Sequence, residues 1–125
     1  MVILICGKKD AGKTTHARRL AAEYGAAGQA AMVLDGDEIR YETNNRDFTD
    51  LGRRSHLIKM AELAAKLESQ DIVAIVACMA PKKEWRDMMR SMWTASRLVY
   101  VPGGELWQGT KYESPIIGEF DVYHR

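Results

Sequence analysis

The chain has 125 residues, and its 18 lysines and arginines nearly balance its 17 aspartates and glutamates, for a formal net charge of +1. This length fits a single domain, residues 1–125, and a near-neutral chain gives no general electrostatic reason to bind nucleic acid or a membrane. The two cysteines and the absence of any apolar run near the roughly 20 residues that span a bilayer favour a cytoplasmic protein without disulfides. We therefore expect neither a membrane nor a nucleic-acid partner.

The chain opens with the apolar run Val2 to Cys6, which is typical of a strand buried on both faces of a parallel sheet. The segment GKKDAGKTT follows, and after it apolar side chains recur at helical spacing as far as Tyr24. This order predicts a strand, a loop and a helix.

The loop matches the pattern GxxxxGK[ST] at Gly7, Gly12, Lys13 and Thr14. Glycines let backbone N–H groups wrap phosphate oxygens, the lysine neutralises the β and γ phosphates, and the hydroxyl holds Mg²⁺. We predict that ATP and Mg²⁺ bind here, with Lys13 in catalysis and Thr14 as a metal ligand. Asp10 is unusual, because a carboxylate repels phosphate unless it points outward or meets a cation. The predicted nucleotide-binding residues are Gly7, Lys8, Lys9, Asp10, Ala11, Gly12, Lys13, Thr14 and Thr15.

A second apolar run, AAMVLD, predicts a strand that ends at Asp35. Because the carboxyl ends of parallel strands border one crevice, Asp35 would face the phosphate loop. It would orient or deprotonate an acceptor hydroxyl there, or hold magnesium. Asp37 suits either the same catalytic role or the N-cap of the next helix. Arg40 suits either an anionic acceptor or a surface ion pair.

The rest of the chain continues the alternation of helices and strands. The predicted elements are a loop over 41–50, a helix spanning Leu57 to Leu67, a strand over 72–80, a helix whose apolar stripe runs from Trp85 to Trp93, and a strand over 97–101. Beyond residue 105 we expect turns and at most a short helix. The pattern predicts an α/β protein of the P-loop nucleoside-triphosphate hydrolase fold, with a parallel sheet of about four strands flanked by helices.

Four segments, in order, resemble the adenylylsulfate kinase family: VLDGDEIR, DFTDLGRR, AELAAKL and a strand that ends at Pro81. The resemblance covers most of residues 2 to 115. It implies an enzyme that transfers the γ-phosphate of ATP, with Mg²⁺, to the 3′-hydroxyl of adenosine 5′-phosphosulfate in sulfate assimilation.

The resemblance also implies roles for individual residues on the acceptor side. It assigns Asp35 to the ribose hydroxyl, and Arg40 and Arg53 to the phosphosulfate. It places Phe48 on one face of the acceptor's adenine, and the segment GELWQGTKYESP places Trp107 on the other. Stacking of this kind contributes about 1 to 3 kcal/mol per base.

Some positions depart from the family pattern. His56 stands where the family usually has asparagine. It would bind the substrate by donating to a phosphate when protonated, and as a lone histidine on a helix it also suits a surface position. Ala80 stands where the family often has serine. The family's basic lid, which excludes water and adds positive charge over the transferred phosphate, is missing after the fourth predicted strand.

Two other functions stay open. The chain is alternatively a kinase of another nucleotide, nucleoside or polynucleotide hydroxyl, or a nucleotide-binding module with little turnover. The aromatic pair favours a base-bearing acceptor, and the missing lid favours the module. A homodimer is one candidate assembly. Basic residues at helical spacing are interpreted as solvated helix faces rather than a nucleic-acid surface: Arg53, Arg54, Lys82, Lys83, Arg86 and Arg90.

Overall fold

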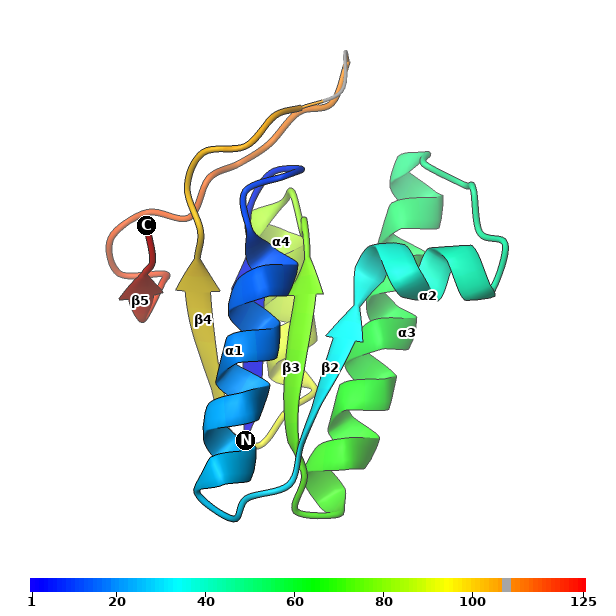
Figure 1. Ribbon diagram of the computed structural model, residues 1–125. Coiled ribbons are helices and arrows are strands. Elements are labelled where there is room, and N and C mark those ends of the chain that lie inside the picture. The colour runs from blue at the N-terminus through cyan, green and yellow to red at the C-terminus, as the bar shows by residue number, and fades with distance from the viewer. Residues whose placement is uncertain (107–108) are drawn as a thin grey trace.

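The computed structural model describes residues 1–106 and 109–125, and within them five parallel strands form one sheet in the order β2-β3-β1-β4-β5 (Figure 1). The strands are β1 (Val2–Cys6), β2 (Ala31–Asp35), β3 (Val73–Cys78), β4 (Ser96–Tyr100) and β5 (Val122–Tyr123). The helices are α1 (Lys13–Ala26), α2 (Gly36–Glu42), α3 (Asp50–Ser69) and α4 (Lys83–Ser91). The predicted α/β fold is confirmed.

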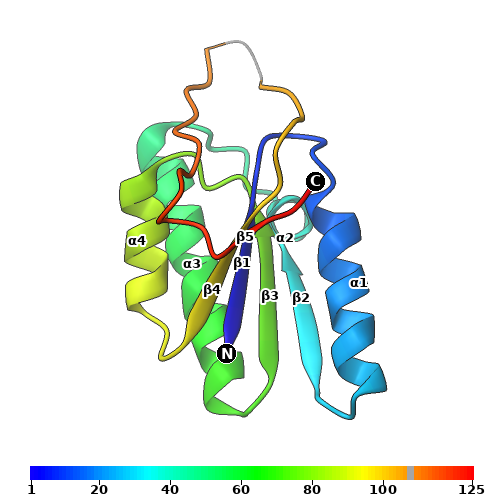
Figure 2. The ribbon, with the colours of Figure 1, turned by 90° about the vertical axis from the view of Figure 1, so that its left-hand side faces the viewer.

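Helix α1 covers one face of the sheet, and α3 and α4 cover the other (Figure 2). Strand β1 is buried along its whole length. Its side chains alternate, so that Ile3 and Ile5 pack in the α1 layer with Ala17, while Leu4 and Cys6 pack in the α3 and α4 layer. Helices on both faces explain why the central strands are continuously apolar in sequence.

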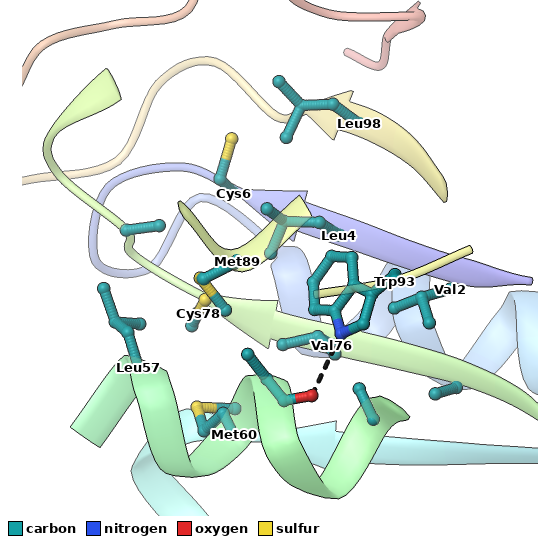
Figure 3. Packing of buried hydrophobic residues seen from close by; sticks show 14 of the residues in the cluster. Val2, Leu4, Cys6, Leu57, Met60, Val76, Cys78, Met89, Trp93 and Leu98 are labelled. Atoms are coloured by element: carbon teal, nitrogen blue, oxygen red, sulfur yellow. Dashed lines mark hydrogen bonds between the residues drawn. The ribbon is translucent and has the colours of Figure 1, made fainter. Parts of the chain in front are cut away.

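The larger core lies between the sheet and helices α3 and α4 (Figure 3). Trp85, Met89 and Trp93 are buried there, as the apolar stripe predicts, and the Trp93 indole Nε1 donates a hydrogen bond to the Ala61 carbonyl at 3.0 Å. Met92, beyond the end of α4, is 37% exposed. The stripe is therefore core packing over most of its length.

The two cysteines are neighbours in register on β1 and β3, and both are buried free thiols. Burial raises the pKa of Cys6 to about 11 and that of Cys78 to about 12. Both thiols are therefore protonated at neutral pH and behave as small apolar side chains.

The sheet contains a short fifth strand that the sequence does not predict. Strand β5 pairs with β4 through Val99 with Val122 and Tyr100 with Tyr123. Two residues are too few to show a period, so only the tertiary pairing defines this strand. Helix α2 also continues through Glu42, two residues into the predicted loop.

The interpretation of the basic residues as solvated is wrong for Arg86, whose side chain is fully buried. Its guanidinium Nε lies 2.6 Å from the buried carboxylate of Glu119, and its NH1 donates to the Ala80 carbonyl at 2.7 Å. Three neighbours form more exposed ion pairs, which are Lys82–Asp50, Lys83–Asp87 and Arg90–Asp121. Acidic partners therefore balance much of this basic cluster.

Residues 1–106 and 109–125 contain no helix with both the length and the apolar character that a bilayer crossing requires.

Candidate active site

The phosphate loop joins the end of β1 to the start of α1 at the carboxyl edge of the sheet (Figure 1). A Cβ at Gly7 would clash with the carbonyl oxygen of Val101, and Gly12 adopts φ 101, so both glycines are needed for the backbone path. Gly12 is also the N-cap of α1 and contributes no capping side chain. First-turn N–H groups of α1 are therefore suited to bind phosphate. Asp10, in the same loop, is exposed and has a positive φ of 60°.

Lys13 lies at the centre of this loop. Its ammonium donates hydrogen bonds to the carbonyls of Gly7 at 2.9 Å and Lys8 at 2.6 Å. Burial lowers the pKa of Lys13, although nearby acidic groups and thiols oppose the shift. The loop therefore holds a fixed cation where the motif requires one.

Asp35 connects this loop to the acceptor side of the crevice. Its Oδ2 accepts a hydrogen bond from the Thr14 hydroxyl. Its Oδ1 accepts from the backbone N–H groups of Asp37 at 2.9 Å and Glu38 at 3.1 Å, so Asp35 is the N-cap of α2. The interpretation of Asp37 as the N-cap is wrong, because Asp37 lies in the first turn and lines the acceptor pocket.

The Thr14 hydroxyl and the Asp35 carboxylate suit Mg²⁺, because both present hard oxygen donors side by side. No group of three or more histidine, cysteine, aspartate or glutamate residues that could hold a metal occurs in the described part of the chain. Mg²⁺ at a phosphoryl-transfer site commonly takes one or two protein ligands and completes its shell with water and phosphate oxygens. The residues present therefore fit this ion.

A pocket of about 220 Å³ lies between the phosphate loop, α2 and the start of α3. It brings together most of the predicted acceptor-side residues. The predicted residues that line it are Lys9, Lys13, Thr14, Asp35, Asp37, Arg40, Phe48, Arg53 and His56. Glu105 and Thr110 also line it. They were not predicted as site residues, although both lie in the segment GELWQGTKYESP, because that segment was used only to place Trp107. Trp107 lies outside the described residues.

Phe48 and two arginines form one wall of the pocket. The guanidinium carbons of Arg40 and Arg53 lie 4.5 and 5.7 Å from the centroid of the Phe48 ring. Arg53 Nε donates to the Phe48 carbonyl at 2.8 Å, and Arg40 NH1 donates to Asn45 Oδ1 at 3.1 Å and the Asp47 carbonyl at 3.2 Å. Within the described part of the chain, Arg40 donates hydrogen bonds to neutral oxygens and lies over a ring, which does not support a surface ion pair. These contacts hold the two guanidinium groups and the Phe48 ring in a defined arrangement.

His56 is 5% exposed, so its interpretation as a surface residue is wrong. Desolvation, followed by the positive charge of Arg40, lowers the pKa of His56 to about 4, against an opposing hydrogen bond with the Gly36 backbone. The imidazole is therefore neutral near pH 7. A neutral ring offers one donor and one acceptor to the pocket rather than a charge.

The segment that follows β4 is bonded directly to the phosphate loop. Lys9 N–H donates to the Glu105 carbonyl at 3.0 Å, and Glu105 N–H donates to the Lys9 carbonyl at 2.8 Å. The returning segment is held by a 2.7 Å bond from Glu113 N–H to the Pro81 carbonyl. Figure 1 shows both segments rising together beyond the carboxyl edge of the sheet. We call residues 102–106 and 109–113 the arm.

The strand order, the phosphate loop and the Thr14–Asp35 pair define a protein of the P-loop nucleoside-triphosphate hydrolase fold. A family model described as adenylylsulphate kinase matches residues 1–103. The chain therefore belongs to the adenylylsulfate kinase family.

Individual relatives agree with this assignment. The adenylyl-sulfate kinase of Paraburkholderia xenovorans is 38% identical over 92 residues, which are 73% of this chain and 51% of that protein. A hexameric APS kinase from Thiobacillus denitrificans is 27% identical with a TM-score of 0.71, over 79% of this chain and 21% of that one. The APS kinase of Mycobacterium tuberculosis shares the fold, with a TM-score of 0.78 at 23% identity, over 91% of this chain and 78% of that one. The chain spans about half the length of the curated relatives it matches.

Proposed function

We propose that this chain transfers the γ-phosphate of ATP to the 3′-hydroxyl of adenosine 5′-phosphosulfate. The observation that carries the proposal is the hydrogen bond between Thr14 and Asp35, which joins the phosphate loop to a pocket lined by Phe48, Arg40 and Arg53. Donor and acceptor sites thus share one crevice. Family membership supports the choice of acceptor.

On the donor side, the loop amides and Lys13 would bind the phosphates, with predicted contacts from residues 7–15 apart from Lys9, whose N–H is bonded to the Glu105 carbonyl. Thr14 and Asp35 would hold Mg²⁺, which neutralises charge that develops on the phosphate oxygens. Lys13 is already held by two loop carbonyls and partly shielded from water. A fixed cation in such a site stabilises transferred charge without first reorganising.

On the acceptor side, Phe48 would stack on the adenine, and Arg40 and Arg53 would bind the phosphosulfate. Asp35 is locked at both oxygens, by Thr14 and by the α2 cap, so it is suited to a fixed orienting role. Asp37 lies in the same pocket and would assist with the hydroxyl proton. His56 would contribute a neutral hydrogen bond where the family usually has asparagine.

The proposal also covers the domain organisation, the oligomeric state and the cellular location. We treat residues 1–125 as one domain, since β5 near the end of the chain joins the same sheet as β1. The hexameric solved relative supports a homo-oligomer, of which a homodimer is one candidate form. A cytoplasmic location fits the two buried free thiols.

The test is acceptor-dependent ADP release. The protein is incubated with Mg·ATP and a panel of acceptors: adenosine 5′-phosphosulfate, AMP, nucleosides and a polynucleotide with a 5′-hydroxyl. A Lys13→Ala variant serves as the control for the phosphate loop. We expect release only with the phosphosulfate and none above background with the variant. Stimulation by a different acceptor would contradict the substrate assignment, and ATP binding without any stimulated release would favour a nucleotide-binding module.

A further inference from the structure

The acceptor pocket has two walls with different origins. The wall formed by Phe48, Arg40 and Arg53 comes from α2, the following loop and α3. The other wall comes from the phosphate loop and the arm, through Lys9, Glu105 and Thr110. The family resemblance assigned no acceptor role to these three residues.

Lys9 belongs to the acceptor pocket although its backbone belongs to the phosphate loop. Its N–H and carbonyl are both bonded to Glu105, so its amide points to the arm and not to a phosphate. Its side chain lines the same pocket as Phe48 and Arg53. The bridge therefore holds the Lys9 backbone against the arm, and from there the Lys9 side chain lines the acceptor pocket.

The balance of charged residues in the pocket lining shows why the positive charge of Lys9 would matter for an anionic acceptor. Arg40 has its NH1 group engaged by Asn45 and Asp47, and Arg53 has its Nε engaged by the Phe48 carbonyl. Asp35, Asp37 and Glu105 add three carboxylates to the pocket lining. Apart from Lys9, the described lining has three cations, Lys13, Arg40 and Arg53, against these three carboxylates. A phosphosulfate carries two negative charges, so without Lys9 it would enter a lining with no net positive charge.

We propose that Lys9 is a specificity-determining residue for the acceptor, whose ammonium binds the anionic 5′ group opposite Arg40 and Arg53. This inference rests on the proposed function for the identity of the acceptor. Lys9 would then supply positive charge from within the phosphate loop, in place of the basic lid that is missing after β4. The same contact would favour an acceptor with a charged 5′ group over an uncharged nucleoside.

The test separates acceptor from donor by comparing Lys9→Met with Lys111→Met. Lys111 is an exposed lysine of the arm that does not line the pocket, so its substitution makes the same change in net charge nearby. We expect Lys9→Met to raise KM for adenosine 5′-phosphosulfate about tenfold or more while changing KM for Mg·ATP less than about twofold. Lys111→Met should change both values less than about twofold, and Lys9→Arg should recover most of the loss.

An equal acceptor KM in Lys9→Met and the wild type would overturn the inference, and so would a rise confined to the KM for Mg·ATP. Either result would leave the proposed function intact. If the wild type shows no turnover with the phosphosulfate, the proposed function fails, and calorimetric binding of adenosine 5′-phosphosulfate and of adenosine still tests Lys9. Weaker binding of the phosphosulfate, but not of adenosine, by Lys9→Met supports the inference. Equal weakening of both, or no weakening, refutes it.

Discussion

The hydroxyl of Thr14 donates a hydrogen bond to Asp35 Oδ2, and this contact joins the first turn of α1 to the end of β2. These residues are 21 positions apart in sequence. They meet because β1 and β2 both pair with β3 in parallel, which brings their carboxyl ends to the same edge of the sheet. The Thr14 hydroxyl, which we propose as a metal ligand, therefore lies beside a carboxylate that lines the acceptor pocket.

Asp35 has a structural role as a helix cap and a proposed chemical role, and two substitutions separate them. Asn is as good an N-cap as Asp, so Asp35→Asn should change the free energy of unfolding by less than about 0.5 kcal/mol. The loss of charge should nevertheless lower kcat at least about 100-fold. Asp35→Ala should also destabilise the protein by about 1 kcal/mol. Steady-state kinetics and urea unfolding measure both effects, and full turnover by Asp35→Asn would exclude the chemical role.

Phe48 should contribute to acceptor affinity through stacking. Loss of one stacked ring corresponds to about 1 to 3 kcal/mol, so Phe48→Leu should raise KM for adenosine 5′-phosphosulfate about 5- to 150-fold. KM for Mg·ATP should stay within about twofold. Tyr41→Leu is the matched control, because Tyr41 is an aromatic residue on α2 that is 88% exposed and lies outside the pocket lining. Equal KM values for the two variants would argue against a base at Phe48.

The adjacent glycines of the arm provide a matched pair for testing the bridge to the phosphate loop. Gly103 and Gly104 both have positive φ, at 90° and 74°, so alanine is strained at either position. Only at Gly104 would the added Cβ clash with the Lys9 carbonyl, whereas Gly103 has open space. We expect Gly104→Ala to destabilise the protein about 1 to 3 kcal/mol more than Gly103→Ala does. Thermal unfolding measures the difference, and equal melting temperatures would mean that the bridge adds little stability.

His56 should make stability depend on pH below neutrality. Its pKa is lowered to about 4 in the folded protein from an ordinary 6.5, so between these values the unfolded chain binds a proton that the folded chain does not. Stability therefore rises with pH across this window and is lost as pH falls from 6.5 towards 4. The effect is on the order of 3 kcal/mol.

The variant His56→Asn isolates this contribution, because asparagine does not titrate. The difference in unfolding free energy between the wild type and the variant should shift in favour of the wild type as pH rises from 4 to 6.5, and stay constant above pH 7. Urea unfolding at several pH values provides the measurement. Parallel pH profiles for the two proteins would show that His56 is protonated equally in both states.

The buried pair of Arg86 and Glu119 should be the most sensitive ion pair of the molecule to single substitution. Arg86→Met would leave the Glu119 carboxylate buried without its cation, at an expected loss of about 3 to 5 kcal/mol. The double variant Arg86→Met with Glu119→Leu should recover much of this loss, since no charge stays buried. Lys83→Met, which breaks the exposed pair with Asp87, should change stability by less than about 1 kcal/mol. Comparable urea midpoints for the two single variants would contradict this ranking.

Much of the fold was predictable because its signals are local. The runs in β1 and β3 are apolar throughout, as strands covered on both faces must be, and the GxxxxGK[ST] spacing predicts both the loop and the helix that follows. The predictions for Phe48 and Arg53 came from a resemblance, whereas Arg40 was already a candidate from its position on the predicted helix. The pocket gathers all three residues.

The sequence by itself determined the strand, loop and helix of the phosphate site, since those depend on neighbouring residues and on period. Only the tertiary structure decided the burial of His56, the capping by Asp35 rather than Asp37, the fifth strand, and the bridge between Lys9 and Glu105. Each of these depends on the packing of one segment against another. Spacing along a chain reports which face a residue occupies, but not which distant backbone or charge that face will meet.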